Sequence, residues 1–246
     1  ALAAAALLAL SAKESTRAAL MSGGGPFRLL ELAAASDAAV ARCGVAALRN
    51  LSEPEETRAQ LLAEPGLLQG LFNLACADDP DVQRDSLIAL MLLATVTSHR
   101  AAFVQLLPAL PFAQLCGTCL VEIEHACARL LFLVARAGAD VSTTLHEVAG
   151  QPLRELLCSE HAVVRTTAAQ AAGRLARHHE AGRVALLDAG VLHPLLRLLE
   201  DDAADEAARR GAAVAMRGLA ASSARHESLV QPKPLRALLA PVVALP

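Results

Sequence analysis

The chain has 246 residues and a formal net charge of −3; 54% of its residues are apolar and only 2% are aromatic, with no tryptophan and no tyrosine. This length and apolar content allow one large domain or a repeat array, and the abundance of leucine and alanine favours helix. The acidic balance argues against a general nucleic-acid binder, and the shortage of aromatic rings argues against the stacking platforms of proteins that bind single strands.

A short apolar element recurs along the chain. Its copies begin at Ala6 (ALLALS), Ala47 (ALRNLS), Ala89 (ALMLLA), Leu130 (LLFLVA), Ala171 (AAGRLA) and Ala215 (AMRGLA). The starts are separated by 41, 42, 41, 41 and 44 residues, which predicts a repeat array. The longest separation contains the acidic segment 200–206, as expected for an insertion in a turn.

Two further helical pieces follow each copy. The first is short, as in STRAAL, ETRAQLL, SHRAAFV and AGRVALL, and the second is apolar, as in PFRLLELA, LLQGLFNLA, QPLRELL and VLHPLLRLL. A glycine or a substitute suits the end of the first piece, at Gly25, Gly66, Pro108, Gly150 and Gly190. SDAAV at Ser36 and DPDV at Asp79 then predict the start of a longer third helix, because aspartate caps free backbone N–H groups and proline fits the first turn.

This pattern resembles the armadillo repeat, whose units run G-x-x-x-x-L-x-x-L-L, then a D-x-x-V entry, then A-L-x-N-L-A. The resemblance covers almost the whole chain, and HEAT repeats are the alternative. It implies an all-α fold, a right-handed α-α superhelix (solenoid) of armadillo-type three-helix repeats. One solenoid is expected over residues 1–246, with units near 1–24 (partial), 25–65, 66–107, 108–149, 150–189, 190–231 and 232–246 (partial).

Neither end of the array carries the polar cap of a terminal repeat. We therefore expect a segment of a longer chain, or ends that are covered by further repeats or by neighbouring subunits.

The resemblance also implies a concave groove along the third helices. Its rows contain basic residues, apolar residues and one asparagine: Arg42, Arg84, His125, Arg129, Arg174, Arg210, Ile88, Leu92, Leu133 and Asn50. Arg49, Arg136, Arg177 and Arg217 extend the charge. The groove predicts a protein or peptide partner with acidic and apolar residues. The alternative is that these arginines lie at solvated helix ends or pair with acids of a neighbouring repeat.

The same rows differ from the grooves of importin-alpha-like proteins, where tryptophan and asparagine ladders hold a lysine-rich peptide. This chain has no tryptophan, and Asn50 is the only asparagine at its position in six copies. The resemblance is nearer to a basic groove of the beta-catenin type, although Asn50 is still expected to face the groove and to grip a peptide backbone.

Two motifs have the look of chemical sites. CGTC at Cys116, with Cys127 nearby, has a zinc-like spacing, but the repeat register places Cys116 and Cys127 at core positions. RHHE at Arg177 falls where one repeat turns into the next. No catalytic residue, cofactor or metal is predicted.

A possible membrane span is also rejected. Residues 101–121 hold no charged side chain and equal the length of a span, but Pro108 and Pro111 would break a single helix.

The sequence therefore predicts a non-catalytic protein–protein interaction scaffold. The alternative is a structural subunit of a large assembly, such as a cytoskeletal or ciliary complex, and an enzyme would need a further domain. Six cysteines at irregular spacing indicate reduced thiols. The expected location is therefore the cytoplasm, with the nucleus or cilium as alternatives.

Overall fold

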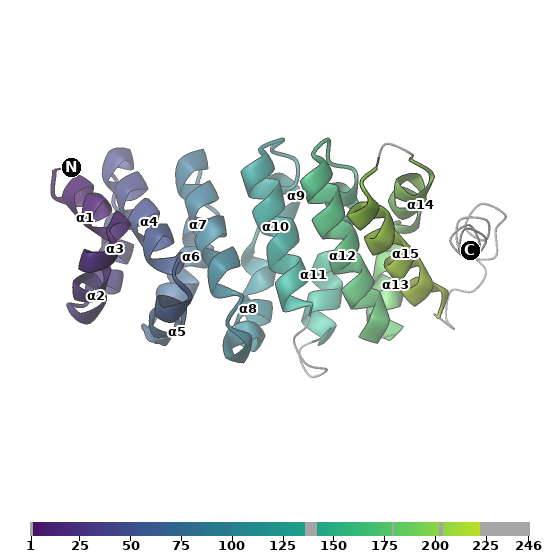
Figure 1. Cartoon of the computed structure of the whole chain (residues 1–246), viewed down its shortest axis with the longest axis horizontal. Helices are drawn as coiled ribbons and strands as arrows, with labels where there is room; N and C mark the ends of the chain where they lie inside the picture. Colours follow the sequence, from purple (N-terminus) through teal and green to yellow (C-terminus); the bar gives the residue numbers. More distant parts are fainter. Residues whose placement is uncertain (1, 136–141, 179, 202–203, 222–246) are drawn as a thin grey trace. The chain divides into compact units, whose positions relative to one another are not determined.

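The computed structural model describes residues 2–135, 142–178, 180–201 and 204–221. Within these ranges every regular element is a helix, and there are fifteen α-helices and two short 3-10 helices (Figure 1). The predicted all-α class is therefore confirmed. The helices fall into two compact units, Ala1–Pro111 and Phe112–Pro246, which are described separately below.

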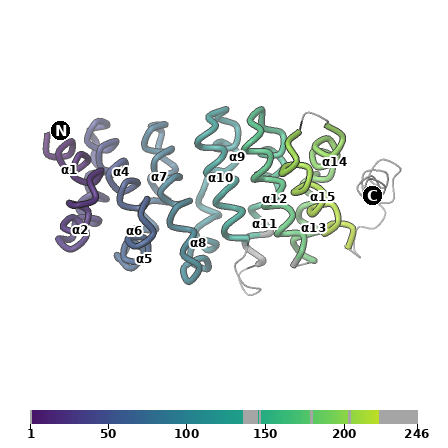
Figure 2. Tube along the Cα trace, in the orientation of Figure 1, coloured from purple at the N-terminus to yellow at the C-terminus, as the bar shows by residue number. Residues whose placement is uncertain are grey.

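The first unit alternates long third helices with pairs of shorter helices. Its elements are α1 (Leu2–Ala12), α2 (Glu14–Ser22), α3 (Gly25–Ala33), α4 (Ala38–Ser52), α5 (Glu55–Ala63), α6 (Leu67–Leu74), α7 (Pro80–Leu93), η1 (Thr97–His99), α8 (Arg100–Leu106) and η2 (Leu107–Ala109). The third helices α1, α4 and α7 pack side by side, with α4 in contact with both of the others. Helix α3 packs on α4 and α6 on α7, so the leucine-rich core lies between the second and third helices. Figure 2 traces the chain through α4 and α7 of this unit.

The second unit contains α9 (Phe112–Leu115), α10 (Val121–Val134), α11 (Ser142–Leu157), α12 (Ala162–His178), α13 (Glu180–Asp188), α14 (Leu192–Glu200) and α15 (Glu206–Ala220). Here the third helices are α10, α12 and α15, and α12 packs against both of the others. Helix α11 packs on α12 and α13, and α14 packs on α15.

Small residues bring α12 and α15 close together. A Cβ atom added at Gly218 would lie 2.7 Å from the Cβ of Ala176, and one added at Gly211 would lie 3.1 Å from the Cβ of Ala169. Both distances are shorter than ordinary carbon–carbon contacts. The glycines therefore set the spacing of the two helices whose faces carry part of the candidate site.

Left-handed glycines mark some of the predicted helix junctions. Gly66 has φ 77° between α5 and α6, and Gly190 has φ 78° between α13 and α14. At the first junction the left-handed residue is Gly24, with φ 69°, and Gly25 is already the first residue of α3. Pro108 lies in the 3-10 helix η2.

The prediction of a helix end at Gly150 was wrong. Gly150 and Pro152 both lie inside α11, which runs without a break from Ser142 to Leu157. The glycine has a packing role instead, since a Cβ atom there would lie 2.9 Å from the carbonyl oxygen of Ala185 in α13. The first and second helices of this repeat are thus one continuous helix.

Aspartates cap the N-termini of three third helices. Asp37 accepts hydrogen bonds from the backbone N–H groups of Ala39 and Val40 at α4. Asp79 does the same at α7, with Pro80 in the first turn as predicted, and Asp205 caps α15. Each cap satisfies N–H groups that have no partner within the helix.

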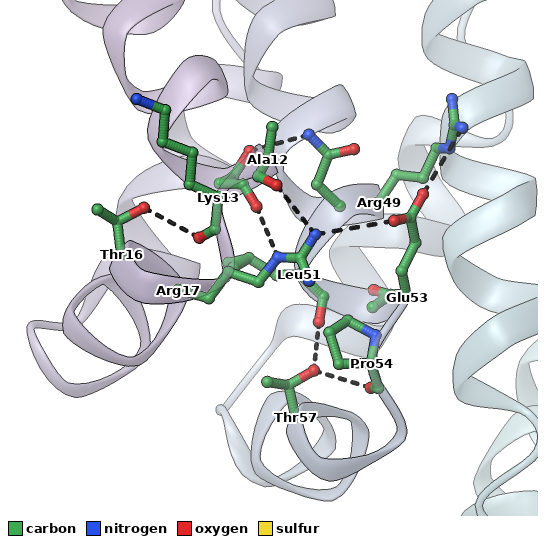
Figure 3. Close-up of polar contacts among 12 residues, drawn as sticks. Ala12, Lys13, Thr16, Arg17, Arg49, Leu51, Glu53, Pro54 and Thr57 are labelled. Atoms are coloured by element: carbon green, nitrogen blue, oxygen red, sulfur yellow. Dashed lines mark hydrogen bonds and ion pairs between the residues drawn. The ribbon is translucent and has the colours of Figure 1, made fainter.

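The C-terminus of α1 is closed by side chains from the next helix. Arg17 donates from Nε to the carbonyl oxygen of Ser11 (2.8 Å) and from Nη2 to that of Ala12 (3.2 Å). Thr16 donates to the carbonyl oxygen of Lys13 at 3.0 Å (Figure 3). A cation at this end also favours the helix dipole.

Arginines close the C-termini of later third helices in the same way. Arg58 donates to the carbonyl oxygens of Ser52 (2.9 Å) and Glu53 (2.6 Å) at the end of α4, and its Nη1 reaches the hydroxyl of Thr95 beyond α7 (3.0 Å). Further copies are Arg100, which donates to Ala94, and Arg183, which donates to Ala176. The short first helices therefore act as clamps on the third helices.

Removing one clamp should destabilise the fold. We expect Arg58→Ala to lower the free energy of unfolding by about 1.5–3 kcal/mol, the range for hydrogen bonds to charged groups. Urea unfolding should show a lower midpoint. The matched control is Arg28→Ala, because Arg28 makes an exposed ion pair with Glu31 and should change stability by less than about 0.5 kcal/mol. Equal losses for the two variants would contradict the clamp.

Candidate partner-binding site

The structure places all ten predicted groove residues on third helices, but in two separate sets. The first unit holds Arg42, Asn50, Arg84, Ile88 and Leu92, and the second holds His125, Arg129, Leu133, Arg174 and Arg210. Arg42 and Arg210 are exposed and most of the others are half-buried. Leu133 is only 7% exposed, so it packs in the core and offers little surface to a partner.

The arginines of the first unit are paired with acids. Arg42 of α4 lies 2.9 Å from Asp79 and 3.6 Å from Asp81, both at the start of α7. Arg84 of α7 lies 2.8 Å from Asp81 and 3.0 Å from the buried Asp85. These pairs link the N-terminal halves of two neighbouring third helices.

The pairing continues from α7 through α4 to Arg17 on α2. Asp85 lies 3.3 Å from Arg49. Arg49 lies 3.8 Å from Glu53, and Glu53 lies 3.9 Å from Arg17 (Figure 3). The whole ion chain joins four arginines with four carboxylates and is therefore electrically neutral. The first unit thus follows the alternative in which arginines of the row pair with acids, including those of the neighbouring repeat.

Asn50 also has a partner inside the protein. Its side-chain nitrogen donates a 3.0 Å hydrogen bond to the hydroxyl of Ser11, which is buried on α1. The amide therefore links two third helices, and one of its two N–H donors is used inside the protein.

The cap of α7 is electrostatically favoured. Burial alone would raise the pKa of Asp79, but hydrogen bonds from the Val82 N–H, the Arg42 guanidinium and the Asp81 N–H together hold the pKa below its ordinary value. Folding therefore favours the ionised carboxylate.

A similar link occurs in the second unit. Thr166 of α12, which occupies the repeat position of Arg42, donates a 2.9 Å hydrogen bond to the Asp205 carboxylate. The Ala208 N–H and the Thr166 hydroxyl lower the pKa of Asp205. The same position of the repeat therefore ties neighbouring third helices together in both units.

Arginines in the second unit are held differently, by an aromatic ring. The guanidinium carbon of Arg174 lies 3.3 Å from the ring centroid of Phe132, and its Nη1 donates a 3.1 Å hydrogen bond to the Phe132 carbonyl oxygen. The guanidinium carbon of Arg129 lies 4.9 Å from the same centroid. Both arrangements are cation–π contacts.

Phe132 was not among the predicted residues. It lies one position before the expected groove row, in the fourth copy of the recurring element. The sequence could have drawn attention to Phe132, because none of the other five copies of the element contains an aromatic residue.

A hollow of about 770 Å³ adjoins this stack. Its lining includes Phe132 of α10, Arg174 and Arg177 of α12, and Arg210 and Val214 of α15. Arg210 pairs with Glu206 one turn away, but the two side chains are 75% and 71% exposed, so this ion pair contributes little. The hollow therefore combines arginines with an apolar side chain and an aromatic edge.

Asp205 and Glu206 also line the hollow. They reduce its positive charge without cancelling it, since three arginines face two carboxylates.

His125 lies on the same helix as Arg129. Burial lowers its pKa first, and the charge of Arg129 lowers it further. The imidazole is therefore neutral near pH 7 and adds a polar group to this helix but no charge.

The cysteine motif is built into the packing. Cys116 and Cys127 are both buried, whereas Cys119 is exposed at a turn with φ 56°. Burial and a hydrogen bond with Cys127 raise the pKa of the Cys116 thiol, the hydrogen bond being the larger cause. Across the ranges that the structure describes, no group of three or more His, Cys, Asp or Glu side chains is arranged to hold a metal ion.

Some predicted features lie outside the described residues. These are Arg136, the second histidine of RHHE at position 179, residues 202–203 of the acidic segment, and residues 222–246, which include the predicted partial unit 232–246. Arg177 and Arg217 are described, and both are exposed.

In the part of the chain that the structure describes, no single helix has the length and apolar character of a membrane span. Two consecutive segments, Pro80–Leu93 and Thr97–Ala109, reach that length and apolar content only together, and they are bent by 109° where they meet.

The cap of α7 should make stability depend on pH. The lowered pKa of Asp79 means that its contribution is fully present above the unfolded value of about 3.9 and is lost progressively as the pH falls from there through the lower pKa of the folded state. We expect Asp79→Asn, which keeps the cap but loses the charge pair with Arg42, to be less stable than the wild type at pH 7. The difference in stability between the two proteins should become smaller as the pH falls from 7 to 3.

Urea unfolding at both pH values measures this difference. The control is Asp78→Asn, which changes an exposed neighbour outside the cap. An equal loss of stability for Asp79→Asn at pH 7 and pH 3 would contradict the electrostatic account.

No protein-family model and no curated protein matches this sequence. Solved structures do match its fold. A computationally designed armadillo repeat protein for modular peptide recognition has a TM-score of 0.77 at 21% identity, covering 88% of this chain and 91% of that one. A designed armadillo repeat protein in complex with the peptide (KR)4 has a TM-score of 0.74 at 20% identity, covering 88% and 91%.

A third match is an engineered protein, with a TM-score of 0.78 at 21% identity, which covers 96% of this chain and 63% of that chain. At these identities the likeness concerns the fold alone. Together with the stacked three-helix pattern of α2–α4 and α5–α7, it shows that this chain has an armadillo-like all-α solenoid fold.

Proposed function

We propose that this protein is a non-catalytic scaffold that binds a segment of a partner protein on the third helices of its second unit. The fold supports a peptide-binding role, because the matching designed proteins include one made for peptide recognition and one in complex with a peptide. The observation that carries the proposal is the arginine-lined hollow beside Phe132.

The second unit is the better candidate because Arg177 and Arg210 of its hollow are exposed, and the ion pair of Arg210 with Glu206 is a solvated one that contributes little. In the first unit Arg42, Arg84 and Arg49 belong to the neutral ion chain, and a partner would have to break those pairs. In the second unit Arg177 is exposed with no ion pair to any described residue, and Arg174 stacks on the ring of Phe132 beside it. We therefore assign binding to a subset of the groove predicted from sequence.

The lining favours a partner segment with acidic and apolar residues. A carboxylate would form charge-assisted hydrogen bonds with the guanidinium groups, and Val214 and the edge of Phe132 would contact an apolar side chain. The peptide (KR)4 in the designed complex is basic, and the surplus of arginine in this hollow would repel such a sequence.

A binding role without a reaction accords with how the protein uses its charged side chains. Among the described residues, the arginines and aspartates mostly cap helices, pair with each other or stack on Phe132.

We further propose a reducing compartment, with the cytoplasm as the expected location. All six cysteines are free thiols, which supports this assignment.

Charge reversal at the exposed arginines tests the binding surface. We expect Arg177→Glu/Arg210→Glu to lose most partner capture in affinity purification, because like charges would then face the acidic segment. The matched control is Arg154→Glu/Arg197→Glu, which makes the same charge change on exposed second-helix positions of the same unit. This control should capture the same partners as the wild type.

Urea unfolding should first show that both double variants are folded. If the hollow variant then captures the wild-type set of partners, the proposed surface is wrong. A structural subunit of a larger assembly, held by other faces, would then be the better function.

A further inference from the structure

The three arginines that line the hollow come from two helices and converge on one space. Arg174 and Arg177 lie three residues apart on α12 and so share a face, and Arg210 lies opposite on α15. Each guanidinium presents up to five N–H donors in a planar fork. The hollow therefore offers many donors to one acceptor-rich group.

Arg174 is already oriented before a ligand arrives. Stacking on Phe132 uses one face of the guanidinium, and one N–H is used by the Phe132 carbonyl oxygen. A guanidinium held in this way loses less side-chain entropy on binding than a mobile one.

Arg210 has a weak partner that a stronger acceptor can replace. Its ion pair with Glu206 is an exposed pair within one helix, of a kind that contributes little to stability. A second carboxylate would merely match Glu206. A group with more charge and more acceptor oxygens would draw Arg210 away.

We propose that the hollow lined by Arg174, Arg177 and Arg210 recognises a phosphorylated serine or threonine in the partner segment. This inference rests on the proposed function and names the chemistry of its ligand. A phosphate monoester carries about −1.5 to −2 charges and three acceptor oxygens. Because the three arginines and the carboxylates of Asp205 and Glu206 leave the site net positive, attraction grows with ligand charge, and phosphate is favoured over carboxylate.

The hollow also offers contacts for the rest of the segment. Val214 and the edge of Phe132 supply apolar surface beside the arginines, and Gln170 supplies an amide. These neighbours suit a peptide with an apolar residue near the phosphate better than a free phosphate.

Binding of matched peptide pools tests the inference. The probe is a fluorescent degenerate peptide pool with one fixed phosphoserine and one fixed leucine, compared with pools that carry serine or glutamate at the same place. We expect the wild type to bind the phosphoserine pool at least about tenfold more tightly than the glutamate pool. Arg177→Glu/Arg210→Glu should lose this preference, and Arg154→Glu/Arg197→Glu should keep it.

A gain of affinity provides a test that misfolding cannot mimic. Glu206→Gln removes the competing carboxylate from Arg210 at a position that is 71% exposed. We expect it to bind the phosphoserine pool several-fold more tightly than the wild type and to leave the serine pool unchanged. An unchanged or lower affinity for the phosphoserine pool would overturn the role of Arg210.

The remaining outcomes separate this inference from the proposed function. If the glutamate and phosphoserine pools bind equally, the phosphate inference is wrong while peptide binding stands. If no pool binds, the phosphate inference is wrong, and the capture experiment above decides the proposed function alone. If vesicles containing a phosphoinositide bind more tightly than the phosphoserine pool, and Arg177→Glu/Arg210→Glu abolishes that binding, the ligand is a membrane surface and the inference is overturned.

Discussion

Closing the ends of the third helices is the constraint on which this structure depends. Every helix leaves unpaired N–H groups at its start and unpaired carbonyl groups at its end, and stacking many helices brings many such ends close together. Here aspartates such as Asp79 close the starts, and arginines such as Arg58 close the ends. The same side chains also reach the neighbouring repeat, through Arg42 to Asp79 and through Arg58 to Thr95. One set of bonds therefore satisfies the backbone and fixes the register between repeats.

The use of arginines in these bonds limits which arginines a partner could contact. An arginine that caps a helix or links two helices already uses its N–H donors within the protein. Displacing it would weaken the packing of neighbouring repeats. The first unit commits its arginines in this way, through the buried Asp85 and the ion chain on either side of it. The second unit places Thr166 where the first has Arg42, so the link to the next helix there needs only a hydroxyl. Arg177, which lies on the same helix as Thr166, is exposed.

The repeat period, the helical class and the aspartate cap of α7 could be predicted from sequence, because each depends on local patterns. The pairing of the arginines could not be decided in the same way. Arg42 and Asp79 are 37 residues apart, and Thr166 and Asp205 are 39 apart, so each bond depends on how one repeat stacks on the next. A search for complementary side chains separated by slightly less than one repeat would have found both. The break expected at Gly150 failed for a related reason, because packing against α13, and not local chain geometry, explains that glycine.

Phe132 orients two arginine side chains of the second unit without adding a negative charge. A carboxylate can hold an arginine in place, but it cancels the charge that would attract a ligand. An aromatic ring holds the guanidinium through its face and adds no net charge. In a chain with only 2% aromatic residues, a single phenylalanine lies within cation–π distance of both Arg129 and Arg174. In the binding role that we propose, the position of this ring would matter more than the number of arginines along the row.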